Sequence, residues 1–347
     1  MSNILKIFDQ DFVLKYFNDE ILAFYPDYLN VDSVIIKPYK KMIWDDTYHV
    51  VVSFDITLSG RSGEEKKVFL VCSAHSEEPR ENVFEVLTHL WKTGFANGWI
   101  DVPYPLFYSP FFKGVFYSGL VGENILKKVR NDLGMAAEKI ALSGRMFAEL
   151  HSMSIDNVPE FNPHSARIKT VIPGVENVLA EMSHRYDKKY DKDLKDLYER
   201  ILEKEEKIFK ERANLCLIHG DAHLENLIDT GPARIGIIDF ADFCIGDFAR
   251  DLGTFMQQLE YRATSIKEEK KDMEKENYLK RIFLEEYISA KGIDLTDDLK
   301  ERIKLYYDWT MVRTATYFFL KADSEPERAE DLLKRTIQSM NSDSFII

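Results

Sequence analysis

Strand-forming residues dominate the chain from about Val31 to Ala74. Val, Ile, Phe and Tyr, which fit a pleated sheet well, are concentrated in three stretches: Ser33–Pro38, Tyr48–Leu58 and Lys67–Ser73. The last two stretches are joined by Ser59–Gly63, a link rich in turn-forming residues. The pattern therefore predicts three strands, of which the second and third form an antiparallel hairpin.

One helix and two further strands follow. Within Arg80–Lys92 the apolar residues recur with the spacing of one helix face: Val83, Val86, Leu87 and Leu90. Short strands are predicted at Leu106–Ser109 and Val115–Ser118, after the breaker-rich stretch Val102–Pro105. The order of three strands, a helix and two strands predicts a small antiparallel sheet that carries one helix.

Helical periodicity dominates from about Gly134 onward, beginning with Ala136–Met153. The exception is the region 216–242, because two short apolar runs bracket a polar loop there: Leu215–Ile218 and Ile235–Ile238. A Gly231-Pro232 pair marks a turn between these runs. We expect polar loops set among helices in a second, mainly helical region.

Length and charge narrow the class of protein. A chain of 347 residues is long enough for two lobes with a sizeable core. Its 46 Lys and Arg residues are outnumbered by 59 Asp and Glu, which gives a formal net charge of -13. Such a surface opposes binding to a polyanion. We therefore expect no nucleic-acid partner, whereas a cationic small substrate would be attracted.

Cysteine usage and hydropathy bear on the compartment. Cys72, Cys216 and Cys244 lie far apart in apolar runs, which argues against a disulfide framework and favours a reducing environment. No stretch approaches the roughly 18 to 20 apolar residues that a bilayer-spanning helix needs. The acidic N-terminal segment lacks the pattern of a signal peptide. We expect a cytoplasmic protein with no membrane partner.

The most informative polar residues lie between His219 and Asp242. His219-Gly220-Asp221 is followed, five residues after the aspartate, by Asn226, and Ile238-Asp239-Phe240 comes later. This arrangement resembles the signature of the aminoglycoside phosphotransferase and choline kinase-like family. The resemblance implies an α+β, bilobal protein-kinase-like fold with a small antiparallel-sheet N-lobe and a larger, mainly helical C-lobe. We then expect the nucleotide-binding lobe at residues 1–118, a hinge at 119–123, and the catalytic loop, metal loop and acceptor site at 124–347.

The resemblance also implies a reaction. Phosphoryl transfer relies on positioning the nucleophile and on neutralising the charge of the nucleotide phosphates. Asp221 is expected to be the catalytic base that orients the acceptor hydroxyl. Asn226 and Asp239 are expected to bind Mg²⁺, a cation that prefers oxygen ligands. ATP or GTP would be the phosphoryl donor.

Further residues are expected to support this site. The resemblance implies a scaffold role for His219. Gly246–Leu252 matches the family pattern Gly-Asp-x-x-x-Asp-Leu, in which Asp247 is a candidate N-cap of the next helix. Asp251 is expected to accept backbone N–H groups of the catalytic loop. For Asp242 two interpretations stay open: contact with the metal through water, or a cap within its own loop.

The predicted nucleotide lobe departs from the family pattern twice. Pro38–Thr47, between the first two strands, contains no glycine, although a glycine-rich turn normally lets the backbone approach the phosphates. On the third strand Cys72 or Ser73 occupies the place of a Lys or Arg that would pair with the phosphates. Glu81 and Glu85 remain as helix carboxylates. The candidates to replace the strand cation are Lys40, Lys41, Lys66 and Lys67.

The base and the acceptor are expected to bind in different regions. Backbone groups of Ser118 and Leu120, where the last strand enters a Gly-containing link, are expected to bind the nucleotide base. In the late helix, Tyr306, Trp309 and Arg313 lie at helical spacing and are candidates for an acceptor pocket. Aromatic packing in the core is the competing interpretation of the same pattern.

The main hypothesis is an ATP- and Mg²⁺-dependent kinase that phosphorylates a hydroxyl of a small molecule such as an amino sugar, amino alcohol or sugar. The alternative is a pseudokinase-type binding or regulatory module, which the missing glycine-rich turn and strand lysine motivate. A protein kinase is disfavoured because no activation segment follows Asp239. His219, Asp221 and His223 could instead form a transition-metal cluster, but no second His-rich motif supplies the remaining ligands.

Overall fold

The computed structural model describes residues 3–45, 47–78, 80–131, 133–211, 215–263 and 273–342. The chain separates into two compact units. The first comprises Met1–Gly122 and Gly236–Ala241, and the second comprises Glu123–Ile235 and Asp242–Ile347. The lobe boundaries expected from the sequence stay a prediction. In this division most of the expected hinge, residues 119–122, belongs to the first unit, as does the short segment 236–241, which contains Asp239.

The first unit is built on an antiparallel five-stranded sheet with the strand order β1-β2-β3-β6-β5. Its helices and strands are α1 (Gln10–Glu20), β1 (Tyr28–Ile43), β2 (Tyr48–Gly60), β3 (Glu65–His75), α2 (Glu81–Lys92), β4 (Ile100–Asp101), β5 (Pro105–Ser109) and β6 (Gly114–Ser118). The order of three strands, a helix and two strands is thus confirmed, with the short β4 as an addition. Strand β1 is longer than the sequence pattern indicated.

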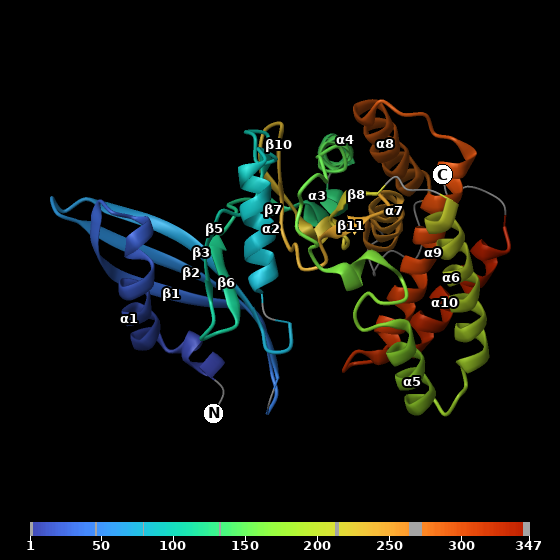
Figure 1. Cartoon of the computed structure of the whole chain (residues 1–347), viewed down its shortest axis with the longest axis horizontal. Helices are drawn as coiled ribbons and strands as arrows, with labels where there is room; N and C mark the ends of the chain where they lie inside the picture. The colour runs from blue at the N-terminus through green and yellow to red at the C-terminus, as the bar shows by residue number, and fades with distance from the viewer. Residues whose placement is uncertain are drawn as a thin grey trace. The chain divides into compact units, whose positions relative to one another are not determined.

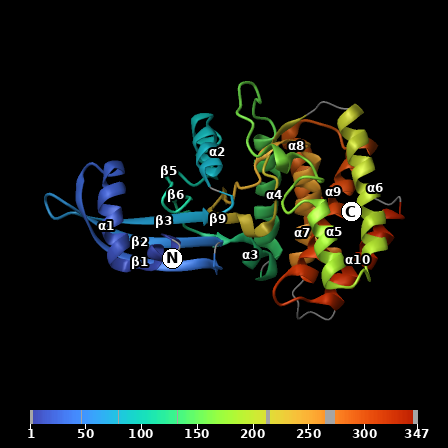
Figure 2. The same ribbon diagram turned by 60° about the horizontal axis from the view of Figure 1, so that its bottom comes forward.

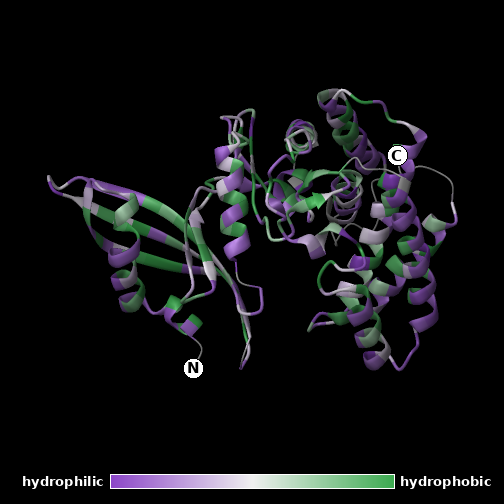
Figure 3. Ribbon diagram, in the orientation of Figure 1, coloured by the Kyte–Doolittle hydropathy of each residue, from purple (hydrophilic) through white to green (hydrophobic). Residues whose placement is uncertain are grey.

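Helix α1 packs against one face of this sheet (Figure 1). Asp9 begins the helix by accepting a hydrogen bond from the amide of Phe12 (3.0 Å). Val13 and Phe17, one turn apart, are buried, and Phe17 meets Phe54 of β2 edge-on with 4.9 Å between the ring centroids. The strands and α1 each show both hydrophobic and hydrophilic colour (Figure 3). The apolar core therefore lies between α1 and one face of the sheet.

The second unit is mainly helical, as expected. Its helices and strands are β7 (Glu123–Asn124), α3 (Ile125–Asn131), α4 (Leu133–Leu150), α5 (Val175–Arg185), α6 (Asp191–Glu211), β8 (Cys216–Ile218), β9 (Leu227–Gly231), β10 (Arg234–Ile237), β11 (Cys244–Gly246), α7 (Ala249–Ala263), α8 (Met273–Lys291), α9 (Asp297–Leu320) and α10 (Pro326–Met340). Strand β10 continues into the segment that belongs to the first unit. None of the helices in the described ranges is both long and apolar enough to cross a membrane.

Helix α9 organises the second unit. It is buried along most of its length and packs against α5, α6, α7 and α10 (Figures 1 and 2). Gly253 of α7 lies where the two backbones meet, because a Cβ there would come within 2.4 Å of the carbonyl oxygen of Ile303 on α9. This close packing fixes α9 relative to α7, the two helices that bear on the candidate site.

Short strands carry the polar loops of the second unit. Strand β8 pairs antiparallel with β11, and β9 pairs with β7 and lies beside β10. Most of their apolar side chains are buried, including Leu217, Ile218 and Leu227. The loop between β8 and β9, which contains Asp221, is therefore anchored by the buried strand β8 at one end and by the buried Leu227 at the other.

Candidate active site

Asp251 of α7 fixes the backbone that leads to Asp221. Its carboxylate accepts the backbone N–H groups of His219 (2.7 Å) and Gly220 (2.9 Å). Asp251 is fully buried, and its Oδ2 lies 3.1 Å from Nε2 of His151 at the end of α4. Burial opposes the charge, but the hydrogen bonds and charges of His151 and His219 outweigh burial and lower the pKa of Asp251. An ionised, fully bonded carboxylate therefore holds the loop.

His151 completes this buried network. Burial lowers the pKa of its imidazole although Asp251 acts in the opposite direction. A neutral imidazole has one N–H donor and one acceptor. Nε2–H therefore donates to Asp251, and Nδ1 accepts from the hydroxyl of Tyr287 on α8 (3.0 Å). The network connects the loop that contains Asp221 to α4, α7 and α8.

Gly220 is required by the shape of the loop. Its φ of +82° lies in the left-handed region, and a Cβ would come within 2.3 Å of the carbonyl oxygen of Asp242. The carbonyl of Gly220 accepts a hydrogen bond from Nη2 of the buried Arg250 (2.9 Å). Both the backbone angle and the close approach explain why the residue before Asp221 is glycine.

The Asp221 carboxylate lies between two basic side chains. Oδ1 is 3.4 Å from Nη1 of Arg313 on α9, and Oδ2 is 3.3 Å from Nε2 of His223. Burial raises the pKa of Asp221, but the charges of His223, Arg313 and His219 outweigh it and hold the pKa below its ordinary value. A carboxylate of this kind is ionised at physiological pH. It is suited to accept a hydrogen bond from a hydroxyl and to orient it, rather than to deprotonate it in advance.

Asn226 offers an oxygen to a cation. Its Nδ2 donates to the backbone carbonyl of Asp221 (3.0 Å), while its Oδ1 accepts no hydrogen bond from the part of the chain that the structure describes. Asp239, the other expected ligand, belongs to the first unit and has a left-handed backbone with a φ of +66°. An amide oxygen and a carboxylate are ligands that Mg²⁺ prefers, so the residue types fit this cation.

A transition-metal cluster finds no support. Within the described ranges, no group of three or more His, Cys, Asp and Glu side chains could hold a metal ion. His219 is fully buried, and its backbone N–H donates to Asp251. The alternative built on His219, Asp221 and His223 is therefore set aside.

Asp247 and Asp242 have different environments. Asp247 is buried, accepts a hydrogen bond from the amide of Ala249 at the start of α7 (3.0 Å), and pairs with Arg302 of α9 (2.7 Å). It therefore ties the beginning of α7 to α9. Asp242 Oδ2 lies 3.9 Å from Nη2 of Arg313, so this guanidinium contacts two carboxylates of the loops.

Two cavities of the second unit share Arg313 and Tyr317 of α9. One, of about 220 Å³, contains Asp221, and the other, of about 340 Å³, contains Trp309. Tyr306 lines neither of them; it is 1% exposed and packs edge-on against Trp309. Two of the three candidate acceptor residues thus reach a cavity. The third faces the core because α9 is surrounded by other helices.

The first unit contains no lysine at the position that the family pattern indicated. Cys72 is fully buried in the core that faces α1, and Ser73 alternates onto the opposite face of β3. Of the candidate replacements, Lys41 lies over the ring of Phe8 (4.4 Å) and Lys66 over that of Tyr25 (5.0 Å). These two lysines are therefore engaged on the α1 side of the unit.

Arg80, which directly precedes α2, was not singled out from the sequence. The helix carboxylates Glu81 and Glu85 are exposed, whereas Arg80 is only 5% exposed. Its Nη1 lies 3.3 Å from Oε2 of Glu78, and its Nε is buried with no partner among the described residues. The sequence around Arg80 gives no signal of a functional role. Its burial, which appears only in the folded chain, sets it apart from a surface arginine.

Ser118 and Leu120 differ in the availability of their backbone. The N–H of Ser118 donates to the carbonyl of Tyr104 (2.9 Å). The peptide groups of Leu120 make no hydrogen bond to any other residue for which the structure gives a placement. Leu120 therefore has free backbone donors and acceptors in the link that follows β6.

Comparison of the sequence with known families gives one match. A family model described as "Phosphotransferase enzyme family" matches residues 60–281, which is more than half of the chain. No curated protein matches the chain.

Solved structures share the fold over most of the chain. An ADP-bound aminoglycoside phosphotransferase, APH(2'')-Ib, is 16% identical with a TM-score of 0.55, over 92% of this chain and 97% of its own. Choline kinase from Cryptosporidium parvum Iowa II is 13% identical with a TM-score of 0.57, over 95% of both chains. Plasmodium vivax ethanolamine kinase is 15% identical with a TM-score of 0.54, over 87% of this chain and 81% of its own. The likeness confirms the expected protein-kinase-like fold.

Proposed function

Because the chain belongs to the phosphotransferase enzyme family, we propose that it transfers the terminal phosphoryl group of ATP or GTP to a hydroxyl group of a small molecule. The observation that carries the proposal is the ionised carboxylate of Asp221, positioned by a buried network and open to a cavity of about 220 Å³. Aminoglycosides, choline and ethanolamine, named with the solved relatives, all carry hydroxyl groups. This chemistry supports a hydroxyl as the acceptor.

Asp221 is the group that we assign to the acceptor. In the proposed step, the acceptor hydroxyl donates a hydrogen bond to Asp221, which directs the oxygen lone pair toward the terminal phosphorus. The new O–P bond forms as the bond to the leaving nucleoside diphosphate breaks, and the hydroxyl proton passes to Asp221. Asn226 and Asp239 would hold Mg²⁺, which neutralises phosphate charge when bound.

The test is a comparison of transfer by the wild type with that of Asp221→Asn. Nucleoside diphosphate release is measured with ATP and GTP against a panel of hydroxylated small molecules. We expect Asp221→Asn to lower acceptor-dependent release by at least about 100-fold, while nucleotide affinity changes by less than about 3-fold. Asp297→Asn, an exposed side chain at the start of α9, is the matched control and should behave as the wild type.

Two outcomes would contradict this proposal. Near-wild-type transfer by Asp221→Asn would remove the assignment of this residue. Absence of any acceptor-dependent release by the wild type, with nucleotide bound, would instead favour a binding module with the same fold.

A further inference from the structure

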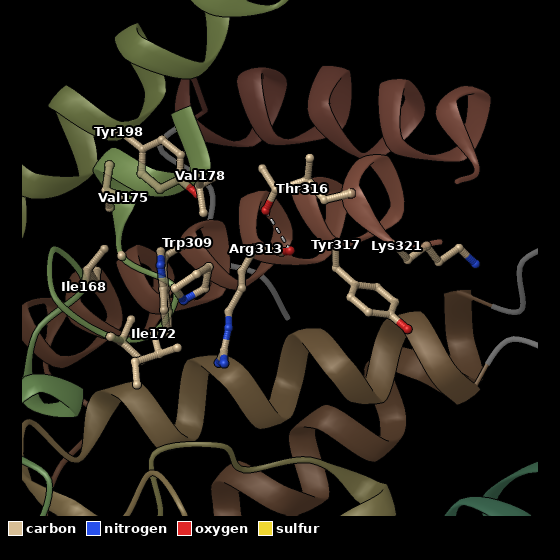
Figure 4. Close-up of a pocket in the computed structure, with 14 residues that line it drawn as sticks. Ile168, Ile172, Val175, Val178, Tyr198, Trp309, Arg313, Thr316, Tyr317 and Lys321 are labelled. Carbon is tan, nitrogen blue, oxygen red and sulfur yellow. Dashed lines mark hydrogen bonds between the residues drawn. The ribbon is translucent and has the colours of Figure 1, made fainter. Parts of the chain in front are cut away.

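The cavity of about 340 Å³ in the second unit is mostly apolar (Figure 4). One wall comes from the segment before α5 and from α5 itself, the other comes from α9, and Tyr198 of α6 also lines the cavity. The labelled side chains include Ile168, Ile172, Val175 and Val178 on the first wall and Trp309 and Arg313 on α9. Its volume is in the range of small-molecule sites, which bury most of their ligand among apolar and aromatic groups.

The charges in this cavity are positive. Of the described residues that line it, the charged ones are Arg313 and Lys321, and none is Asp or Glu. Arg313 lies over the ring of Trp309, 5.5 Å from its centroid, and Lys321 forms an ion pair with Glu325 outside the lining. An ammonium group would meet no carboxylate in this lining, and the nearby carboxylates of Asp221 and Asp242 are already paired with Arg313. The negative net charge of the whole chain therefore does not describe this cavity.

We propose that this cavity binds an uncharged, apolar body of the acceptor, aromatic or alicyclic, while the hydroxyl to be phosphorylated lies at Asp221. The inference rests on the proposed function and narrows its acceptor class. Arg313 and Tyr317 line both this cavity and the one that contains Asp221, so the two cavities adjoin at these side chains. Trp309 and the aliphatic side chains of the α5 wall provide the apolar contact surface.

A matched pair of probes tests the charge preference. The probes are 2-(2-naphthyl)ethanol and 2-(2-naphthyl)ethylamine, which share a ring system and differ in the charge of the end group at neutral pH. Binding is measured by titration calorimetry without nucleotide. We expect the alcohol to bind at least about 10-fold more tightly than the amine. Kanamycin, a polycation, should show no binding at this site.

Two variants of a residue at the rim test whether the preference for the uncharged probe arises in this cavity. Ile172 lines it and is 42% exposed, so the fold should tolerate a polar side chain there. Ile172→Glu adds a carboxylate, and Ile172→Gln is the uncharged control of equal size. We expect Ile172→Glu to shift the alcohol-to-amine ratio toward the amine by about 5-fold or more, and Ile172→Gln to leave the ratio unchanged.

Equal or tighter binding of the amine by the wild type would overturn the inference, as would a ratio that Ile172→Glu does not change. These measurements contain no nucleotide, so they are independent of the proposed function. Phosphorylation of kanamycin or ethanolamine, with no binding of the naphthyl alcohol, would support the proposed function and overturn the neutral acceptor body.

A second inference concerns Arg80 in the first unit and is carried by a different observation. The Nε of Arg80 is buried with no hydrogen-bond partner among the described residues, and its contact with Glu78 is long at 3.3 Å. A buried guanidinium with unused donors is unfavourable unless a ligand binds it. Five donors in a planar fork suit the oxygens of a phosphate.

The surroundings of Arg80 agree with a phosphate site. His49 and His75, opposite each other on β2 and β3, are within the electrostatic influence of Arg80: burial lowers the pKa of both imidazoles, and the charge of Arg80 lowers it further. Burial raises the pKa of Tyr117 on β6, where Asp239 acts in the same direction and Arg80 in the opposite one. Arg80 and the candidate metal ligand Asp239 thus both influence Tyr117, and Arg80 also influences His75 at the end of β3.

We infer that Arg80 replaces the strand lysine of the family and binds the phosphates of the nucleotide. This inference also rests on the proposed function. It explains how a chain with Cys72 and Ser73 at the usual lysine position could retain a cation at the phosphates.

Calorimetric titration with nucleotides and nucleosides tests this role. ATP and GTP with Mg²⁺ are compared with adenosine and guanosine in the wild type, Arg80→Met and Arg80→Lys. We expect Arg80→Met to weaken triphosphate binding by about 10- to 100-fold and to leave nucleoside binding unchanged, with Arg80→Lys in between. Equal losses for triphosphate and nucleoside, or no loss at all, would overturn the inference. Triphosphate binding by the wild type is the separate test of the proposed function.

Discussion

Arg313 of α9 lies 3.4 Å from the Asp221 carboxylate, Nη1 to Oδ1, and the same guanidinium lies 3.9 Å from Oδ2 of Asp242. Both partners of the first pair are about one-third exposed, at 32% and 30%, so the pair itself stabilises the fold only modestly. The larger effect of this pair is to keep the Asp221 carboxylate ionised and to orient its side chain. The late helix, which also lines both cavities, thereby connects these cavities to the Asp221 carboxylate.

Replacing Arg313 should alter the pH dependence of transfer. Burial raises the pKa of Asp221, and Arg313 is one of the charges that outweigh burial and lower it. In Arg313→Met the pKa of Asp221 rises, so the carboxylate becomes protonated, and stops accepting a hydrogen bond, at a higher pH than in the wild type. We expect kcat to fall by about 10-fold and the acidic limb of the kcat profile to move to higher pH. Arg313→Lys should keep the limb near its wild-type position, whereas an unmoved limb in Arg313→Met would contradict this role.

The buried network around Asp251 should show graded effects on stability. Asp251→Asn places an NH₂ group against N–H donors and leaves buried groups without partners, so we expect the free energy of unfolding to fall by about 2–5 kcal/mol. Tyr287→Phe removes only the outer hydrogen bond to His151 and should cost about 1 kcal/mol. Urea unfolding followed by circular dichroism measures both. Equal, small losses in the two variants would show that Asp251 is not central to the loop.

His49 should make the folded state sensitive to acid. Burial, with the charges of Lys40, Arg80 and His75, lowers the pKa of His49 from 6.5 to about 3. Between these values the unfolded chain binds a proton at His49 that the folded chain does not, so stability contributed above pH 6.5 is lost as the pH falls toward 3. We expect the unfolding midpoint to fall less steeply over this interval in His49→Gln than in the wild type. Thermal unfolding at a series of pH values compares the two slopes, and identical slopes would contradict the effect.

The secondary structure near the site could be predicted because local patterns determine it. Runs of strand-forming residues predict the strands β2, β3, β5 and β6. The spacing of the apolar residues Val83, Val86, Leu87 and Leu90 predicts helix α2. Strand β1 is longer than the predicted Ser33–Pro38. The sequence pattern missed its end because β1 lies at the edge of the sheet, where residues such as Tyr39 and Lys40 are exposed and show no apolar alternation. Its length depends on pairing with β2, which the local sequence does not report.

The candidate residues of the loops could be selected from a motif, but the surrounding cavities could not. The roles of Asp221, Asn226 and Asp239 stay predictions from spacing and residue type. The α5 wall of the larger cavity, which includes Val175 and Val178, consists of aliphatic residues that look like ordinary core residues in sequence. The burial of Arg80 also depends on tertiary packing, so the sequence directed attention to four lysines instead.

Thermal stabilisation by nucleotides tests the central claim most directly. The wild type, Asp239→Ala and Asp221→Asn are unfolded with ATP and with GTP, each with and without Mg²⁺. A ligand that binds only the folded state at 100 times its dissociation constant stabilises it by about 2.7 kcal/mol, which is a shift of several degrees. A phosphotransferase of this kind should show a Mg²⁺-dependent shift with at least one nucleotide, lost in Asp239→Ala and kept in Asp221→Asn. No shift in the wild type with either nucleotide, or an unchanged shift in Asp239→Ala, would contradict a magnesium-dependent nucleotide site in this protein.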